Sequence, residues 1–225
     1  MSEFTLDGLW AHGYARLGIL FDRQRCEATR QLYSQPERFR SRIDMARYRF
    51  GRGEYQYFSY PLPAHVEELR HSLYERLSPI ATEWMSALSM ARQYPAKLET
   101  FLEECHAAGQ DRPTPLLLRY GAQDFNCLHQ DLYGEIFFPF QVVFCLSRPR
   151  EEFTGGDLLL VEQQPRAQSI GHAIALEQGE AVVITTRYRP VKGTRGYYRT
   201  NFRHGVSPLL SGERYSLGMI FHDAS

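Results

Sequence analysis

The hydrophobic pattern of the chain changes near residue 114, and this change constrains the fold more than any other feature. Before it, apolar residues recur at three and four positions, as in Val66, Leu69, Leu73 and Leu77, which is the period of an amphipathic helix. After it, Gly, Pro, Asp and Asn separate short apolar or β-rich runs at 116–118, 141–146, 158–161, 181–186 and 215–221. Several short strands with turn signals predict a sandwich or barrel. We therefore expect an α+β chain with its helices first and a β-rich half after them.

The region before residue 114 is expected to be mainly helical. Asp22 is a candidate N-cap, and Gln35-Pro36 closes the helix that it begins. Residues 38–60 alternate arginine with aromatic residues, and we interpret them as a loop with one or two extended pieces. We expect a strand over 14–20 and helices over 23–33, 66–77, 80–92 and 95–108. Without a linker or repeat, the chain is predicted to be a single domain over 1–225, with 1–113 as a support region and 114–225 as the core.

Composition limits the cellular context and the partners. The chain is 43% hydrophobic, but no run of about 18 apolar residues is present, so we expect no membrane partner. The acidic start lacks the features of a secretory signal, and the four cysteines are widely spaced. We therefore expect reduced thiols, a cytoplasmic protein and no disulfide-linked partner; no oligomeric state is indicated. Formal net charge is zero, but only Lys97 and Lys192 are lysines, so arginine supplies nearly all of the 26 cations.

An HxD motif in the β-rich half is the strongest sign of chemistry. His129 and Asp131 share a face if they lie on a strand, and His204 follows late in the same half. Two histidines and one carboxylate leave three positions open on a metal, the arrangement of non-haem Fe(II) oxygenases. The same spacing at His65 falls at the start of an amphipathic helix, where residues two apart do not face together. We therefore predict a metal site from His129, Asp131 and His204.

From Leu116 to its end, the chain resembles the Fe(II)/2-oxoglutarate-dependent dioxygenase superfamily. The resemblance rests on His129, Asp131 and His204, on Arg214 ten residues later, and on Gly155-Gly156-Asp157-Leu158 between the ligands. It implies a double-stranded β-helix, or jelly roll, with flanking N-terminal helices. It also implies an oxidoreductase in which Fe(II) and 2-oxoglutarate are cofactors and O₂ is a co-substrate.

The resemblance assigns roles to single residues. His129, Asp131 and His204 would bind Fe(II), and Arg214 would bind the distal carboxylate of 2-oxoglutarate. Ser216, one side chain along the same strand face, is a candidate to assist. Tyr120 is a further cofactor-binding candidate, because AlkB-type demethylases carry a tyrosine at that position that contacts 2-oxoglutarate.

The first prediction for the substrate is a damaged nucleic-acid base that is oxidatively demethylated. The whole chain, including residues 52–58 and Leu128-His129-Gln130-Asp131, resembles a bacterial oxygenase family predicted to act on damaged nucleic acid. Arginines and tyrosines are interleaved before His204, and such residues can contact phosphates and stack on a flipped base. The candidate substrate residues are Arg187, Tyr188, Arg189, Tyr197, Tyr198 and Arg199. Residues 38–58 are a candidate for a second surface of this kind.

Two other functions remain open. AlkB-type enzymes carry a second arginine six residues after the position of Arg214, where this chain has Ile220. The Gly-Gly-Asp-Leu turn and the single arginine also occur in prolyl-hydroxylase-like members, so hydroxylation of a protein side chain or free amino acid is an alternative. A metal-binding jelly roll without oxygenase activity is the other. Two further expectations concern single residues: Cys127 is interpreted as a small buried thiol and His222 as a solvent-exposed terminal residue.

Overall fold

The structure, a computed structural model, describes residues 5–225. Its first half contains helices α1 (Asp7–His12), α2 (Arg23–Gln31), α3 (Met45–Tyr48), α4 (Ala64–Ala87) and α5 (Leu98–Ala107), 3-10 turns η1 (Leu32–Ser34) and η2 (Pro36–Arg38), and strands β1 (Tyr14–Ile19), β2 (Phe39–Asp44), β3 (Gly51–Arg52) and β4 (Glu54–Phe58). The second half contains strands only: β5 (Leu116–Tyr120), β6 (Phe125–His129), β7 (Phe140–Cys145), β8 (Phe153–Gly155), β9 (Leu158–Gln163), β10 (Ile170–Ile174), β11 (Glu180–Thr185), β12 (Tyr188–Gly193), β13 (Gly196–Val206), β14 (Leu209–Gly212) and β15 (Arg214–Ile220).

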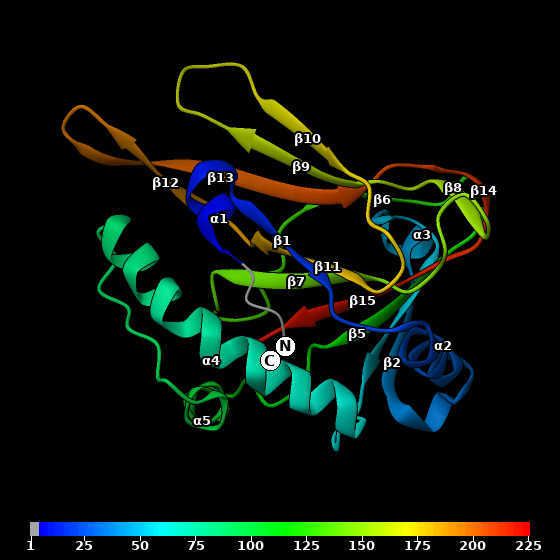
Figure 1. Ribbon diagram of the computed structural model, residues 1–225. Coiled ribbons are helices and arrows are strands. Elements are labelled where there is room, and N and C mark those ends of the chain that lie inside the picture. The colour runs from blue at the N-terminus through cyan, green and yellow to red at the C-terminus, as the bar shows by residue number, and fades with distance from the viewer. Residues whose placement is uncertain (1–4) are drawn as a thin grey trace.

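Two antiparallel sheets face each other and helices cover one of them (Figure 1). The larger sheet has the order β1-β11-β7-β15-β5-β4-β2, and the smaller has β10-β9-β13-β6-β3, with β12 paired to β13. A separate two-stranded sheet joins β14 to β8. The predicted α+β jelly roll is therefore confirmed. The strands expected within 116–118, 141–146, 158–161, 181–186 and 215–221 form as β5, β7, β9, β11 and β15.

The alternation of side chains along β11 explains the layers. Ala181 and Val183 belong to the core between the larger sheet and the helices, whereas Val182 and Ile184 belong to the core between the two sheets. Successive side chains of a strand point to opposite faces, so a strand that is apolar at every position is buried on both sides. Helices α4 and α5 lie under the larger sheet and cover its outer face (Figure 1).

The helix expected to end near residue 77 and the one expected from 80 to 92 are one continuous helix, α4, which ends at Ala87. Pro79 lies inside it and leaves the carbonyl of Glu75 without its usual amide partner. The Ser78 hydroxyl donates to that carbonyl at 3.5 Å. Because Leu77, Ala81 and Trp84 are all fully buried, packing of this face outweighs the cost of the proline.

The N-terminal region, expected to be mainly helical with a strand over 14–20 and one or two extended pieces over 38–60, contributes strands to both sheets. The strand expected over 14–20 forms as β1 and pairs with β11. Residues 38–60, expected to be mostly loop, form strands β2, β3 and β4 with the short helix α3 between them. Asp22 caps α2 as predicted, since its Oδ1 accepts a hydrogen bond from the Arg25 amide at 2.7 Å. Of the helices in residues 5–225, none has the length and apolar character needed to cross a bilayer.

Candidate functional site

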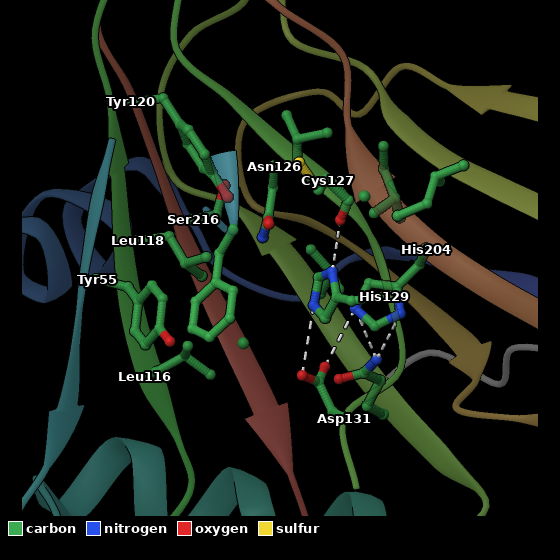
Figure 2. Close-up of a pocket in the computed structure, with 18 of the residues that line it drawn as sticks. Tyr55, Leu116, Leu118, Tyr120, Asn126, Cys127, His129, Asp131, His204 and Ser216 are labelled. Carbon is green, nitrogen blue, oxygen red and sulfur yellow. Dashed lines mark hydrogen bonds and ion pairs between the residues drawn. The ribbon is translucent and has the colours of Figure 1, made fainter. Parts of the chain in front are cut away.

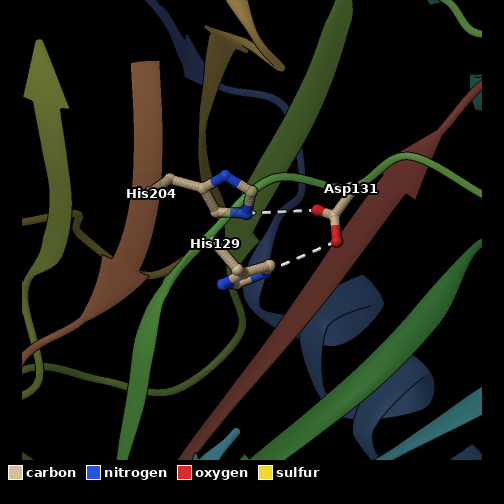
Figure 3. Close-up of side chains that lie close together, drawn as sticks. All are labelled: His129, Asp131 and His204. Carbon is tan, nitrogen blue, oxygen red and sulfur yellow. Dashed lines mark ion pairs between the residues drawn. The ribbon is translucent and has the colours of Figure 1, made fainter. Parts of the chain in front are cut away.

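Strand pairing brings the three predicted metal ligands together. His129, the last residue of β6, is the cross-strand neighbour of His204 on β13. Gly205 permits this close approach, because a Cβ at that position would lie 2.6 Å from the Asn126 carbonyl oxygen. Asp131 lies in the loop just after β6 rather than on the strand, and its carboxylate still reaches both rings (Figure 3). Its Oδ1 lies 3.4 Å from His129 Nε2 and its Oδ2 lies 3.1 Å from His204 Nε2.

The surrounding polar groups orient the two imidazoles. Nδ1 of His129 donates to the Cys127 carbonyl at 2.7 Å, which leaves Nε2 with a free lone pair toward Asp131. The Gln141 amide nitrogen, from β7 of the larger sheet, lies 3.1 Å from His204 Nε2. The candidate ligand atoms of the three residues all lie within 4.8 Å of one another. A histidine ligand held by its second nitrogen is a recurring feature of metal sites.

A chain of phenols holds Asp131. The Tyr133 hydroxyl donates to Asp131 Oδ1 at 2.5 Å, and the Tyr57 hydroxyl donates to the Tyr133 oxygen at 2.9 Å. Burial and the Asp131 carboxylate together raise the pKa of Tyr133 well above its usual range, so that Tyr133 stays a donor. One carboxylate oxygen is therefore occupied by a protein hydrogen bond, and Oδ2 has no phenol partner.

The protonation states of His129, Asp131 and His204 favour the binding of a cation. Burial alone would raise the pKa of the Asp131 carboxyl, but His129 and His204 outweigh it and hold that pKa well below its usual range. Burial and the neighbouring His129 lower the pKa of His204, which keeps this imidazole neutral. For His129, burial acts to lower the pKa, but the Asp131 carboxylate prevails and raises it. An ionised carboxylate beside two imidazoles is the donor set that Fe(II) takes in facial-triad sites.

A second polar group lies on the larger sheet and consists of the predicted cofactor residues. Arg214 and Ser216 share a face of β15, and Tyr120 is the cross-strand partner of Arg214 on β5. All three side chains are buried. In residues 5–225, six buried side-chain atoms lack a hydrogen-bond partner, and three of them are Tyr120 Oη, Arg214 Nη1 and Ser216 Oγ.

The two groups line one cavity of about 360 Å³. Figure 2 shows Tyr120 and Ser216 toward one end of this cavity and His129, Asp131 and His204 toward the other. Apolar and aromatic side chains form the walls between them: Tyr55, Tyr57, Leu116, Leu118, Val143 and Val206. Because buried polar atoms are normally paired, three unpaired donors in a cavity fit an anionic ligand with several oxygen acceptors.

The predicted substrate residues lie elsewhere. None of the six is among the residues from 5 to 225 that line the cavity; they belong to the hairpin of β12 and β13 or immediately precede it. In Figure 1 the tip of this hairpin and α3 lie at opposite ends of the smaller sheet. Arg189 is buried, with its guanidinium 2.7 Å from Glu162 and also bonded to the carbonyls of Trp10 and Ala11. Its prediction as a substrate residue is wrong, because its donors are used inside the fold.

The other hairpin residues are also directed to one another. The guanidinium groups of Arg187 and Arg199 each lie 4.5 Å from the ring centroid of Tyr188. Tyr197 and Tyr198 are exposed. The contact between Arg199 and Tyr188 crosses from β13 to β12, so this part of the interleaved sequence pattern reflects cross-strand packing.

Sequence reasoning missed four residues that shape the cavity. Tyr133 and Gln141 contact the metal-ligand candidates, and Arg49 and Phe50 line the cavity opening. Only the arginine and aromatic pattern of 38–58 signalled any of them. Two further expectations are wrong. Cys127 is exposed, because β6 lies at the exposed side of the cavity and is covered only in part, with Leu128 beside it exposed as well.

His222 is fully buried rather than solvent-exposed. Its Nδ1 accepts a hydrogen bond from the Phe138 amide at 3.2 Å. Burial lowers the pKa of His222 to about 4, so the ring is neutral at pH 7. Because the chain after β15 returns over the core, its last histidine packs inside the fold.

Comparison with known proteins gave matches at three levels. The model of the Oxygenase-NA family, described as "Oxygenase, catalysing oxidative methylation of damaged DNA", matches residues 53–224. The uncharacterized protein Rv2227 of Mycobacterium tuberculosis is 52% identical over 168 residues, which cover 75% of this chain and 72% of that protein.

Two solved structures share the fold at low identity. A prolyl-4-hydroxylase of Pseudomonas putida has a TM-score of 0.56 at 15% identity and covers 97% of both chains. A prolyl hydroxylase of Trichoplax adhaerens, in complex with a peptide fragment of hypoxia inducible factor, has a TM-score of 0.60 at 13% identity, covering 98% of this chain and 88% of that one. At such low sequence identities, these similarities are evidence for a shared fold only.

Proposed function

Because the chain belongs to the Oxygenase-NA family, we propose that it hydroxylates a C–H bond on a methylated, damaged nucleic-acid base and so removes the methyl group. The predicted superfamily, the Fe(II)/2-oxoglutarate oxygenases, and the predicted enzyme class, an oxidoreductase, are confirmed by the family match together with the shared fold. Fe(II) and 2-oxoglutarate are the cofactors of that superfamily. One observation carries the proposal: a single cavity joins the His-Asp-His cluster to three buried donors without partners.

The residues at the two ends of the cavity would bind different groups. His129, Asp131 and His204 would hold Fe(II), with Asp131 offering the oxygen that Tyr133 does not occupy. Arg214 would bind the distal carboxylate of 2-oxoglutarate, with Tyr120 and Ser216 as further donors. An arginine fork matches a carboxylate in charge and geometry. Once bound, the pair supplies oxidation of a C–H bond by O₂, with 2-oxoglutarate leaving as succinate and CO₂.

The side chains of this protein position and protect the reaction. The Nδ1–H of His129 donates to the Cys127 carbonyl and the Tyr133 hydroxyl donates to Asp131, so each group keeps its own proton and does not offer it to the substrate. Tyr55, Leu118 and Val143 make apolar walls that exclude water. Two of the wall residues, Tyr55 and Tyr57, contact each other edge to face with ring centroids 5.3 Å apart. Aromatic walls favour a flat substrate group with a π face, such as a nucleobase.

The test is succinate and formaldehyde release in the presence of Fe(II), 2-oxoglutarate and O₂. The assay compares an N-methylated single-stranded oligonucleotide with the same oligonucleotide lacking the methyl group. We expect succinate formation to rise with the methylated strand only, and formaldehyde to appear in equal amount, since hydroxylation of an N-methyl carbon releases it. His129→Ala serves as the blank. Equal succinate release with both strands, without formaldehyde, would exclude demethylation.

Hydroxylation of a protein side chain or free amino acid is the second candidate. It is favoured by one observation, that the two solved structures described above, which share the fold, are prolyl hydroxylases. The same assay with proline-containing peptides separates the two, because a stable hydroxylated product would form there without formaldehyde.

A further inference from the structure

An exposed pair of aromatic rings stands at the opening of the cavity. Tyr48, at the end of α3, and Phe50, just after it, are 49% and 48% exposed. Their rings are stacked, with centroids 5.6 Å apart and an interplanar angle of 21°. Phe50 and its neighbour Arg49 line the cavity, as does Leu128, which is 42% exposed. Exposed rings beside a buried reaction site are available to a ligand that extends out of it.

The segment that carries this pair is held rigidly against the strand of the first metal-ligand candidate. Asp44 caps α3 through the Ala46 amide at 3.0 Å, and Met45 beneath it is fully buried. The Phe50 carbonyl accepts a hydrogen bond from the Cys127 amide at 2.8 Å, two residues before His129. Gly51 then pairs with Asn126 of β6.

The glycine is required at this junction. Gly51 has φ of +141°, and a Cβ there would lie 2.2 Å from the Phe125 carbonyl oxygen. Arg49 adopts the left-handed conformation with φ of +61°, which turns the chain sharply between the two rings. The rings are therefore preorganised and fixed in position relative to the cavity.

Three arginines near the rings have no carboxylate partner in the described chain, and the carboxylates Asp44, Glu54, Asp124 and Glu213 line the adjoining hollow with Arg47 and Tyr48. Arg47, Arg49 and Arg52 are exposed, and within residues 5–225 none of them makes an ion pair. Arg47 lies over the Tyr48 ring at 5.9 Å. Nearby Arg42 differs, because it pairs with Glu54. Fixed aromatic rings interspersed with free guanidinium groups match a ligand that alternates flat bases with phosphates.

We propose that residues 45–52 bind single-stranded nucleic acid beside the cavity. Bases next to the target nucleotide stack on Tyr48 and Phe50, Arg47, Arg49 and Arg52 contact the phosphates, and the target base enters the cavity. This inference rests on the proposed function for the class of substrate. It assigns recognition to the 45–52 segment rather than to the β12–β13 hairpin.

The experiment measures binding without turnover. A short fluorescein-labelled single-stranded oligonucleotide is titrated with the full-length protein, without added cofactors, and anisotropy is followed. We expect Phe50→Ala to weaken binding at least about fivefold, as loss of a base-stacking ring does. Phe50→Trp should retain wild-type affinity and Phe50→Leu should not, because a flat ring rather than apolar bulk is needed. The matched control is Tyr197→Ala, an equally exposed ring on the hairpin, which should leave affinity within about twofold.

Salt dependence tests the arginines independently. The logarithm of the association constant falls linearly with the logarithm of the salt concentration. The magnitude of this slope should be smaller by roughly 0.7 in each of Arg47→Met and Arg49→Met, as expected for the loss of one phosphate contact to a single strand. Wild-type binding with no change in any 45–52 variant would overturn this inference while leaving the proposed function intact. Absence of oligonucleotide binding, with binding of a labelled poly-glutamate peptide instead, would overturn both the inference and the proposed nucleic-acid substrate.

Discussion

Two segments of this protein have nearly the same composition of arginine and aromatic residues, but they differ in burial and in their distance from the cavity. On the β12–β13 hairpin, Arg187 and Arg199 both contact the Tyr188 ring, Arg189 is buried against Glu162, and none of these residues lines the cavity. In 45–52, Arg47 also lies over a ring, that of Tyr48, but no arginine is buried against a carboxylate within the described chain, and Arg49 and Phe50 line the cavity. Local composition indicates which contacts are available; the neighbouring strands decide which of them are already made.

The contrast between the two segments holds only if the reaction takes place in the cavity. Asp131→Asn should lower 2-oxoglutarate turnover by more than about 100-fold, because a ligand contributes more to a metal site than the groups that support it. Arg199→Met, on the hairpin, should leave turnover within about twofold. Succinate release measures both, with circular dichroism to check folding. Full activity in Asp131→Asn would remove this residue from the metal site.

The hairpin's buried cation should matter to stability instead. Arg189→Met should lower the free energy of unfolding by about 3–5 kcal/mol, because Glu162 then remains buried without a cationic partner and keeps only the hydrogen bond from the Thr200 hydroxyl. Arg47→Met, at the cavity opening, should change it by less than about 0.5 kcal/mol. Urea unfolding measures both. If Arg189→Met and Arg47→Met were equally stable, the hairpin arginine would not serve the fold, and the contrast between the segments would fail.

A variant of Tyr133 tests whether its hydrogen bond to Asp131 strengthens metal binding. Tyr133→Phe removes the hydrogen bond to Asp131 Oδ1 while keeping the ring, and should weaken Mn(II) binding by about tenfold or more. Tyr48→Phe, which loses an exposed hydroxyl at the opening, should leave the metal affinity unchanged. Isothermal titration calorimetry measures both. Unchanged affinity in Tyr133→Phe would show that Asp131 needs no support from the phenol.

The smallest effect concerns the hairpin surface. Arg199→Met removes one of the two guanidinium groups over Tyr188 and should lower stability by about 0.5–1 kcal/mol, the usual size of an exposed cation–π contact. Urea unfolding measures it against Lys192→Met on the same hairpin, which should be neutral. A stability change in Lys192→Met as large as that in Arg199→Met would mean that charge, rather than the ring contact, is responsible.

Much of the fold and the centre of the site could be predicted from the sequence. Apolar runs of strand length identified β5, β7, β9, β11 and β15, and the run is longest where both faces are covered, as in β11. Strands with polar faces, such as β6 and β13, carry no such run and were not predicted. The break expected between helices 66–77 and 80–92 is absent, because packing of Leu77 and Trp84 outweighs the cost of Pro79 inside α4.

The sequence by itself determined the candidate residues: His129, Asp131, His204 and Arg214 stand in an order and spacing typical of the superfamily, and the fold brings them to one cavity. Tertiary structure alone decided which polar groups support Asp131 and which arginines stay free. The reason is physical. The charge and valence of a bound group decide which side-chain types can bind it. Those residue types can be recognised in the sequence one by one. Pairing depends on contacts between distant strands, as when Phe50 meets Cys127, and no local pattern contains them.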